Sequence, residues 1–583
     1  MILSSASDTS LNLPLLDLSL TLISIAVAFC WPRLFSSSFS YVERTFGQLA
    51  RRRGLAVATT GLAALLLRLA ILPICPIPLP FVADDFSFLL AADTFLHGRL
   101  TNPTPAMWTH FETIHVTMRP TYMSMYFPSQ GLMLAAGKLL FGHPWYGVLL
   151  TCALMCSAIC WMLQAWLPPT WALLGGLIAV LHLALFSYWI NTYHSGGALG
   201  ALGGALVLGS LPRLMKTAQF RYGLLMAVGI SLLVLTRPYE GLLLCLPVTV
   251  ALGRWVLFGK NRPAPGVLIR RAAVPLALIV ATVAWLGYYD YRAFGSPTTL
   301  PYTVNRATYA MAPYFVWQPR RPEPAYRHEE MRRFYYEAEM EFYGYIHSPS
   351  GFLPQTLLKA TFTMMFFSGF ALLPPLLMVR RVFMDTRMRF LIQSVLVLAA
   401  GLVIQIYVIP HYVAPFTAAF YAIGLQAMRH LWLWKPEGKP VGMTLVRLCV
   451  LLCLVLPGLR LYAGPLHLAL YRWPASRWNF VWYGPDHFGT DRAKIETSLE
   501  QLPGNQLVLV RYTPKHNPID EWVYNSADID SSKVIWAQEM DASNNAELIR
   551  YYKDRQVWLA QPDAMSTQLS PFTLSEQVAS ASH

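Results

Sequence analysis

The chain has 583 residues, of which 55% are hydrophobic and only 13% are charged, and its mean hydropathy is +0.40. A soluble protein of this length would form several domains and carry about 25% charged residues, so the composition excludes that class. The 13% of aromatic residues and the long apolar runs exclude collagen-like and disordered chains. We therefore predict a polytopic membrane protein.

A helix needs about 20 mainly apolar residues to cross the hydrocarbon layer. Runs of this kind, some short or closely spaced, predict about twelve spans, near 12–31, 54–77, 145–166, 171–190, 196–214, 222–236, 239–258, 271–290, 356–380, 389–409, 411–429 and 442–463. The first run lacks the basic start and small-residue cleavage site of a signal peptide, so we expect it to be retained. The expected fold class is an all-α polytopic membrane protein with about twelve transmembrane helices.

Basic residues concentrate in five of the loops between these spans, at 32–53, 213–221, 254–271, 380–389 and 429–447. The only acidic residues in them are Glu43, Asp385 and Glu437. The positive-inside rule makes this side cytoplasmic. Topology thus accounts for the net charge of +14, and no nucleic-acid partner is needed to explain it. The segments then predicted to lie outside are the N-terminus, 78–144, 291–355 and everything beyond 464.

The last part of the chain, 465–583, has the composition of a soluble domain. Short buried strands are predicted at 506–511, 533–537 and 556–560, with helices near 517–526 and 545–554. Alternating strands and helices indicate a small extracytoplasmic α/β domain with a parallel sheet. The predicted domains are an extra N-terminal span with a basic loop (1–53), a transmembrane catalytic domain (54–464) and this C-terminal domain (465–583).

Two adjacent carboxylates, Asp84 and Asp85, follow the second predicted span directly. Carboxylates at a membrane boundary are costly unless they are solvated, paired or used in function. Their position suits a base that deprotonates an acceptor hydroxyl, or a group that binds a metal ion or a sugar. The alternative is that one of them only caps the helix predicted from about Phe86 to Leu96.

The same outer loop is rich in polar residues, namely His110, Glu112, His115, Arg119, Tyr126 and Gln130. Glu112 and His115 are of a type that ligates metals, and Arg119 could bind a phosphate. The alternative is a solvated loop with ordinary side-chain pairs. One apolar face over 133–141 predicts an amphipathic helix along the membrane interface.

Arg237 lies between two closely spaced spans, on the outer side by the predicted topology. A charged turn there favours binding of an anionic headgroup, and the alternative is an arginine that snorkels to the interface. His411 and Tyr412 are predicted on the same side and could join the same pocket. In the second outer loop, Arg292 and neighbouring tyrosines could line a sugar site, although Tyr and Arg are also common at membrane interfaces.

Taken in order, these motifs resemble the GT-C superfamily of integral-membrane glycosyltransferases, in particular bacterial members related to protein mannosyltransferases and to the aminoarabinose transferase of lipid A. The likeness spans roughly residues 54–430. Its pieces are Asp84-Asp85 after an early span, Leu96-His97-Gly98, Tyr126-Phe127-Pro128-Ser129-Gln130-Gly131, Leu235-Thr236-Arg237-Pro238-Tyr239-Glu240-Gly241 and His411-Tyr412-Val413-Ala414-Pro415. The order and spacing of these pieces carry the resemblance.

The resemblance implies a sugar donor carried on a polyprenyl phosphate in the lipid bilayer. It also implies a bacterial inner-membrane protein whose active site and C-terminal domain are periplasmic. By the resemblance, Asp84 is the expected base, Asp85 binds the acceptor or a metal, and Arg237 faces the lipid phosphate. A single displacement by these groups would invert the anomeric carbon.

Other positions are expected to bind ligands. His411, Tyr412, Arg119 and Arg292 are candidates for the donor phosphate or sugar. Glu112, His115, Tyr126 and Gln130 are candidates for the acceptor or a metal. The resemblance leaves a divalent metal ion open, and it does not identify the sugar (hexose or pentose) or the acceptor (lipid, glycan or protein).

Two other classes compete with a transferase. A transporter or lipid flippase would show paired repeats and broken helices around a site at the membrane midplane. The sequence shows no clear internal repeat, and its charges gather in the outer loops. A membrane scaffold whose C-terminal domain binds a partner would make the acidic pair incidental.

Overall fold

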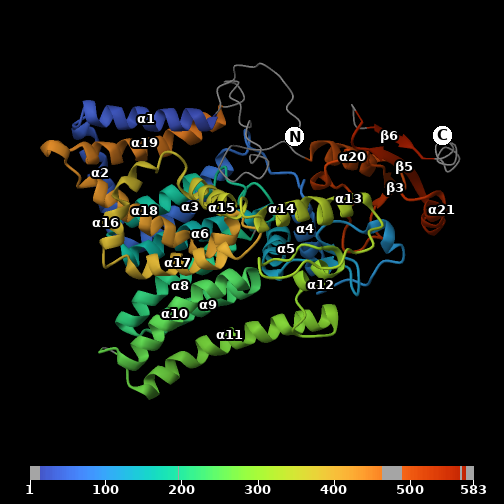
Figure 1. Cartoon of the computed structure of the whole chain (residues 1–583), viewed down its shortest axis with the longest axis horizontal. Helices are drawn as coiled ribbons and strands as arrows, with labels where there is room; N and C mark the ends of the chain where they lie inside the picture. Colours follow the sequence, from blue (N-terminus) through green and yellow to red (C-terminus); the bar gives the residue numbers. More distant parts are fainter. Residues whose placement is uncertain (1–12, 195, 261, 463–488, 565–567, 573–583) are drawn as a thin grey trace.

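A computed structural model describes residues 13–194, 196–260, 262–462, 489–564 and 568–572. The chain forms a large helical body and, at one end of it, a small C-terminal unit built on a sheet (Figure 1). The stretch 465–488 of the predicted C-terminal domain lies outside the described residues.

The helical body contains helices α1 to α19. Their bounds are α1 Leu13–Cys30, α2 Ser36–Arg51, α3 Arg53–Ala70, α4 Ala83–Leu96, α5 Pro128–Phe141, α6 Trp145–Trp166, α7 Pro169–Leu183, α8 Gly197–Thr217, α9 Phe220–Thr236, α10 Pro238–Phe258, α11 Pro265–Phe294, α12 Pro301–Tyr309, α13 Glu329–Arg332, α14 Glu339–His347, α15 Phe352–Ser368, α16 Val379–Met384, α17 Arg389–Val403, α18 Thr417–Trp432 and α19 Val441–Leu461. A short hairpin, β1 Val116–Thr117 and β2 Met123–Ser124, lies in the first outer loop.

Six helices of the described residues are long and apolar enough to cross a membrane: α3, α6, α8, α10, α11 and α19. A seventh candidate is a bent pair, in which residues 374–384 meet α17 at 108°. Shorter apolar helices are α1, α7 and α9. The chain is thus a multi-pass membrane protein, but these helices do not confirm a count of about twelve spans.

Glycine and proline interrupt two of the predicted spans. Near 356–380, α15 ends at Gly369, whose φ of +56° is left-handed, and Pro374 and Pro375 then begin a 3₁₀ turn. Near 411–429, residues 410–416 are held as a 3₁₀ turn that contains Pro410 and Pro415, so α18 has only 16 residues. Proline lacks a backbone N–H and clashes with the preceding turn, which explains both breaks.

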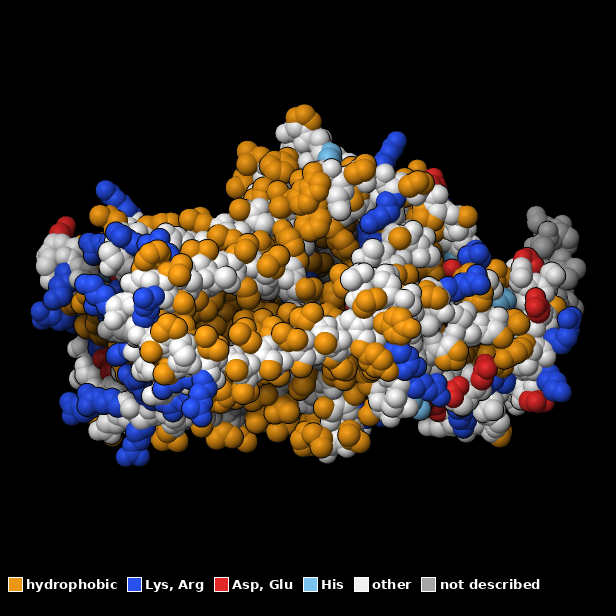
Figure 2. Space-filling model, turned by 90° about the horizontal axis from the view of Figure 1, so that it is seen from below, with side chains coloured by type: hydrophobic (Ala, Val, Ile, Leu, Met, Phe, Trp, Pro, Cys, Tyr) orange, Lys and Arg blue, Asp and Glu red, His pale blue; other side chains and the backbone are white. Residues whose placement is uncertain are grey.

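The surface of the helical body is mostly apolar, as expected for a region in contact with lipid (Figure 2). Lys and Arg side chains gather at the end of the body farthest from the C-terminal unit, where α2 and α16 lie (Figures 1 and 2). The N-terminal helix α1 packs along α19, and a buried ion pair joins Asp17 Oδ2 to Arg460 Nη2 at 2.6 Å.

Helix α5 packs closely against the beginning of α6. A Cβ atom on Gly147 would lie 1.9 Å from the carbonyl oxygen of Met133, so only glycine permits this approach. The last turn of α5 exposes Leu139, Leu140 and Phe141. Residues 133–141 are therefore helical as expected, and the position of this helix along the membrane interface stays a prediction.

The C-terminal unit contains α20 Thr490–Gln501, β3 Asn505–Val510, β4 Val534–Gln538, α21 Ala542–Tyr551, β5 Arg555–Gln561 and β6 Gln568–Pro571. The strand order is β4-β3-β5-β6, in which the first three strands are parallel and β6 is antiparallel. The three predicted strands and the helix near 545–554 are therefore confirmed as a small C-terminal sheet region.

The helix predicted near 517–526 is wrong. Only Pro518–Asp520 form a short 3₁₀ turn, and the chain then runs without regular structure. The buried carboxylate of Glu521 accepts hydrogen bonds from the backbone N–H groups of Trp522 and Val523. The carboxylate thus gives these backbone N–H groups hydrogen-bond partners without a helix. The apolar pattern of 517–526 reflects burial of its side chains in the core.

One face of the C-terminal sheet packs directly on α4 and the first outer loop. A single buried cluster joins Phe86, Leu90 and Ile114 to sheet residues such as Leu507 and Ile535. Tyr524 stacks on Phe86 with ring centroids 4.4 Å apart. The sheet therefore holds in place the helix that carries the acidic pair.

Candidate active site

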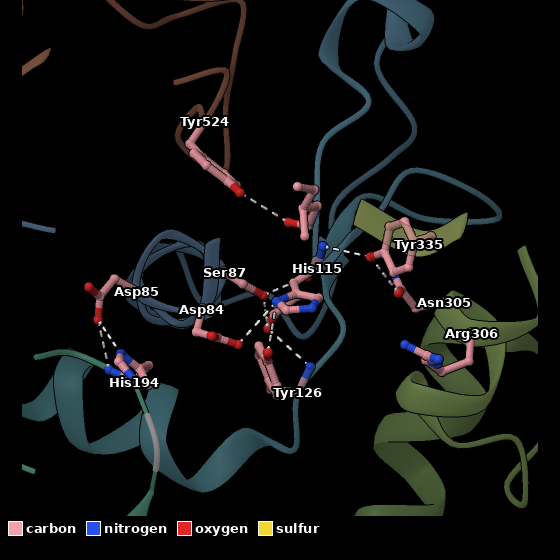
Figure 3. Close-up of polar contacts among 12 residues, drawn as sticks. Asp84, Asp85, Ser87, His115, Tyr126, His194, Asn305, Arg306, Tyr335 and Tyr524 are labelled. Atoms are coloured by element: carbon pink, nitrogen blue, oxygen red, sulfur yellow. Dashed lines mark hydrogen bonds and ion pairs between the residues drawn. The ribbon is translucent and has the colours of Figure 1, made fainter. Parts of the chain in front are cut away.

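The two adjacent carboxylates diverge at the start of α4. Figure 3 shows Asp85 directed toward His194, whereas Asp84 points to the other side, toward His115. Successive positions on a helix are separated by about 100°, so two neighbouring residues need not face the same environment. The divergence gives the two acids different neighbours.

Asp85 is fully buried, and its hydrogen bonds join the start of α4 to Phe81 and to the segment of Tyr193 and His194. Its Oδ1 accepts from the backbone N–H groups of Tyr193 (2.8 Å) and His194 (3.1 Å) and lies 2.8 Å from His194 Nδ1. Its Oδ2 accepts from the Phe81 N–H at 3.4 Å. Both oxygens are thus occupied by donors from the protein.

Asp84 is 22% exposed and pairs with His115 across 3.0 Å, from Oδ1 to Nδ1. Burial alone would raise the pKa of the Asp84 carboxyl, but His115, His194 and Arg237 together hold that pKa below its usual value. Asp84 is therefore ionised at neutral pH while remaining accessible. This state is what a general base requires.

His115 is held by contacts to three segments. Its backbone is left-handed, with φ +63°. Its N–H donates to the Tyr335 hydroxyl at 3.0 Å, and its carbonyl accepts from the Ser87 hydroxyl at 2.7 Å. Its Nδ1 also lies 3.0 Å from the hydroxyl of Tyr126. Tyr335 in turn donates to Asn305 (Figure 3), so the second outer loop fixes the partner of Asp84.

Arg237 lies in the break between α9 and α10, with its guanidinium carbon 4.3 Å from the ring centroid of Tyr412. Burial lowers the pKa of Arg237, but Glu240 and nearby tyrosines raise it above its usual value, so the cation is permanent. A small cavity separates Arg237 from Tyr126. Its lining is Phe88, Tyr126, Phe127, Ser129, Gln130, Gly196, Thr236, Arg237 and Tyr302.

His411 lies on the Asp85 side of the same region. We call this region the chamber; it consists of the small cavity and the residues around it, Asp84, Asp85, His115, His194, His411 and Tyr412. The Nδ1 of His411 lies 2.9 Å from the Tyr188 hydroxyl, and its ring centroid lies 6.3 Å from that of His194. The structure thus brings together Asp84, His115, Tyr126, Gln130, Arg237, His411 and Tyr412 from positions up to about 330 residues apart in the sequence.

Of the predicted residues, Tyr126, Gln130 and Arg237 line the cavity itself. Four others are engaged by neighbours outside the chamber. Glu112 is buried and accepts from Tyr309 and Arg327, and burial raises its pKa above the usual value although these partners oppose the rise. Arg119 lies over Trp108 at 5.1 Å. Arg292 is exposed and donates to Tyr288 at 3.0 Å. The fourth, His110, contacts the carbonyl oxygen of Gln538.

The residues present do not fit a metal site. Within the described part of the chain, no three His, Cys, Asp or Glu side chains are grouped so that they could hold an ion. Both oxygens of Asp85 already accept N–H groups. Glu112 is engaged by Tyr309 and Arg327, whereas His115 is engaged by Asp84, so the pair expected from the sequence does not converge.

Comparison with models of known protein families finds no match, and no curated protein sequence matches the chain. Solved structures are more informative about the fold. The oligosaccharyltransferase of Archaeoglobus fulgidus, in complex with Zn and sulfate, aligns over 87% of this chain and 67% of that chain, with 10% identity and a TM-score of 0.46.

ArnT from Cupriavidus metallidurans, in the apo state, aligns over 86% of this chain and 93% of that chain, with 13% identity and a TM-score of 0.46. Both proteins are GT-C glycosyltransferases, the superfamily that the sequence resembles.

Sequence reasoning missed several residues of the chamber, among them His194, Tyr188, Tyr302, Asn305 and Tyr335. His194 had a readable signal, since it lies in the short gap between two predicted spans on the same side as Arg237. The tyrosines had none, because aromatic residues are common at membrane interfaces.

His194 is expected to make thermal stability depend on pH. Burial lowers its pKa, but Asp85 and Asp84 outweigh burial and Arg237, so the pKa is raised above 6.5. The His194–Asp85 pair therefore stabilises the fold fully below pH 6.5 and loses this contribution as pH rises through the raised pKa. The melting temperature should fall between pH 6 and pH 9 by about 2 °C more in wild type than in His194→Gln. Parallel curves would contradict this assignment.

Proposed function

We propose that the protein is a membrane glycosyltransferase that moves a sugar from a polyprenyl-phosphate donor to an acceptor hydroxyl on the extracytoplasmic side. The observation that carries the proposal is the chamber itself, which holds an accessible, ionised Asp84 and, close enough to help lower its pKa, the permanent cation Arg237. A lipid-linked donor cannot leave the bilayer. Its phosphosugar must therefore meet the protein at a membrane boundary, and the position of Asp84 and Arg237 between predicted spans supports such a meeting point.

The reaction is a single displacement at the anomeric carbon. The acceptor hydroxyl loses its proton to the Asp84 carboxylate as its oxygen bonds to the anomeric carbon. The bond between that carbon and the phosphate oxygen breaks at the same time, and the polyprenyl phosphate leaves with the electron pair. Arg237 offsets the charge that develops on the leaving oxygen. Attack from the side opposite the leaving group inverts the configuration.

His115, Tyr126 and Tyr412 support this chemistry. His115 orients the Asp84 carboxylate, and Tyr126 contacts His115 while lining the cavity beside Arg237. Tyr412 lies against the guanidinium of Arg237 and fixes its direction. Gln130 donates to the Tyr193 carbonyl and also lines the cavity, so it shapes the space for the sugar.

The proposal places the protein in a bacterial inner membrane, with the chamber and the C-terminal unit in the periplasm. Clustering of Lys and Arg at the opposite end of the helical body supports this orientation by the positive-inside rule (Figure 2). The donor sugar, a hexose or a pentose, is left open by the site.

A direct assay separates a transferase from a transporter. Purified protein is incubated with a radiolabelled polyprenyl-phosphate sugar, first in detergent and then in sealed vesicles. A transferase releases the sugar from the lipid, to an acceptor or to water. Movement of intact donor across the vesicle without cleavage would instead identify a flippase, and no effect at all would favour a scaffold.

Arg237→Gln is expected to lower kcat/KM for the donor by about 10²–10³-fold, the loss seen when one charge-stabilising donor is removed from an active site. Arg237→Lys should retain part of the activity, because it keeps the charge but not the planar contact with Tyr412. Arg550→Gln, an exposed site on α21, is the matched control. Equal rates for Arg237→Gln and the control would exclude Arg237 from the reaction.

A further inference from the structure

A second hollow, of about 610 Å³, lies where the C-terminal unit meets the segment leading into α4. The loops that follow β3 and β5 line it, together with the start of α20 and two aromatic residues, Phe81 and Phe86. Open α/β sheets bind ligands beyond the carboxyl ends of their parallel strands, and β3 and β5 end here. None of the residues assigned to transfer lines this hollow.

His516 provides independent evidence for a ligand in this hollow. Its side chain lines the hollow and is only 5% exposed. Its Nδ1 lies 2.8 Å from Asp563 Oδ1, whereas its Nε2 has no hydrogen-bond partner among the described residues. Buried polar atoms are nearly always bonded. A polar group in the hollow would supply the missing partner.

The lining carries both signs of charge, with acids and bases in similar numbers: Asp491, Asp520, Glu521 and Asp563 against Arg492, Lys494 and Lys515. Such a lining does not select a strongly charged ligand. Carboxylates and the amide of Asn517 bind hydroxyl groups well. Phe81 and Trp522 add apolar surface, and a sugar presents both hydroxyl groups and an apolar face to a site of this kind.

The hollow adjoins the catalytic helix. Phe86, which lines it, is two residues beyond Asp84 in the first turn of α4 and lies 4.7 Å from the guanidinium of Arg492. The N–H of Phe81 donates to Asp85. Successive positions on a helix are about 100° apart, so Asp84 and Phe86 point to nearly opposite sides of one helical turn, with the hollow on the side of Phe86.

We infer that this hollow binds the carbohydrate part of the acceptor, a neutral glycan with free hydroxyl groups, and holds it beside α4. The inference rests on the proposed function and deepens it by naming the acceptor class. His516 and Asp563 are the central contacts, and the exposed Asp491 stands at the start of α20 where the hollow meets solvent.

The test measures binding without any donor. Purified full-length protein in detergent is applied to an array of neutral, anionic and cationic glycans and to a peptide array. Wild type should bind neutral glycans. Asp563→Asn, which keeps the side-chain shape, and Asp491→Trp, which fills the hollow, should each weaken binding at least tenfold. Asp554→Trp is the matched control, because this exposed residue precedes β5, at the end of the strands opposite the hollow.

Equal glycan binding by wild type, Asp563→Asn and Asp491→Trp would overturn the inference, and so would binding restricted to anionic glycans or to peptides. Donor cleavage by wild type, measured separately, distinguishes the two possible failures. A protein that cleaves the donor but binds no glycan overturns the inference about the hollow alone. A protein that never cleaves the donor overturns the proposed function and, with it, the acceptor role.

Discussion

Asp84→Asn is expected to lower the rate of sugar transfer by about 10²–10⁴-fold, the contribution typical of a positioned general base. The amide keeps the shape of the side chain but cannot accept the proton of the acceptor hydroxyl. The affinity for the donor should not weaken, because the substitution removes a negative charge that would repel the donor phosphate in the chamber. The measurement is kcat and KM for a radiolabelled polyprenyl-phosphate sugar, with purified protein.

The control for this experiment is Asp554→Asn, at an exposed position before β5. Asp84→Glu should keep part of the activity, since the carboxylate remains but is displaced by one methylene. The pKa of Asp84 lies below its usual value of 3.8, so the carboxylate stays ionised as the pH falls to that value. Loss of the base by protonation is therefore expected only below pH 3.8. A rate in Asp84→Asn above one tenth of wild type would show that another group is the base.

The helical character of the body and the position of the polar motifs between apolar runs were predictable from the sequence, because both follow from local patterns. Apolar runs long enough to cross a bilayer define the helical body. Asp84, Arg237 and His411 all stand at breaks between such runs, and a charge at a break is readable without knowing the fold. The β-strands of the C-terminal unit were predictable for the same reason, since their apolar stretches are short and bounded by polar residues.

The different surroundings of the two acids could not be predicted from the residues themselves. Asp84 and Asp85 are adjacent and chemically identical, and their surroundings differ because His115 approaches one and His194 the other. His194 lies 109 residues from Asp85 in the sequence, and Tyr335 lies 220 residues from His115, which it holds. Contacts at such separations arise from packing and leave no periodic signal.

Packing of the C-terminal unit on α4 was equally hidden. Composition predicted a soluble domain, but the face of its sheet shares a core with Phe86 and Ile114 of the first outer loop. The hydrogen bond from Ala527 N–H to Asp93 on α4, at 2.8 Å, belongs to the same contact. The C-terminal unit therefore packs directly against the helix that carries the site, and the proposed binding of the acceptor depends on this contact.

Asp85→Ala is expected to destabilise the fold by about 3–5 kcal/mol, the cost of removing one partner of a buried charged pair. Three backbone N–H groups, those of Phe81, Tyr193 and His194, lose their acceptor together with the His194 side chain. Each unsatisfied buried group costs about 1–3 kcal/mol on its own. The measurement is the melting temperature and the yield of monodisperse protein in detergent.

The neighbouring substitution Asp84→Ala provides the contrast, because Asp84 is partly exposed and its ion pair is with His115. It should abolish transfer while leaving the melting temperature within a few degrees of wild type. Asp85→Asn should fall between the two alanine variants in stability, since its amide oxygen still accepts N–H groups while its amide nitrogen cannot. If Asp85→Ala melted like wild type and lost only transfer, Asp85 would belong to the chemistry, and the two acids would act as a catalytic pair.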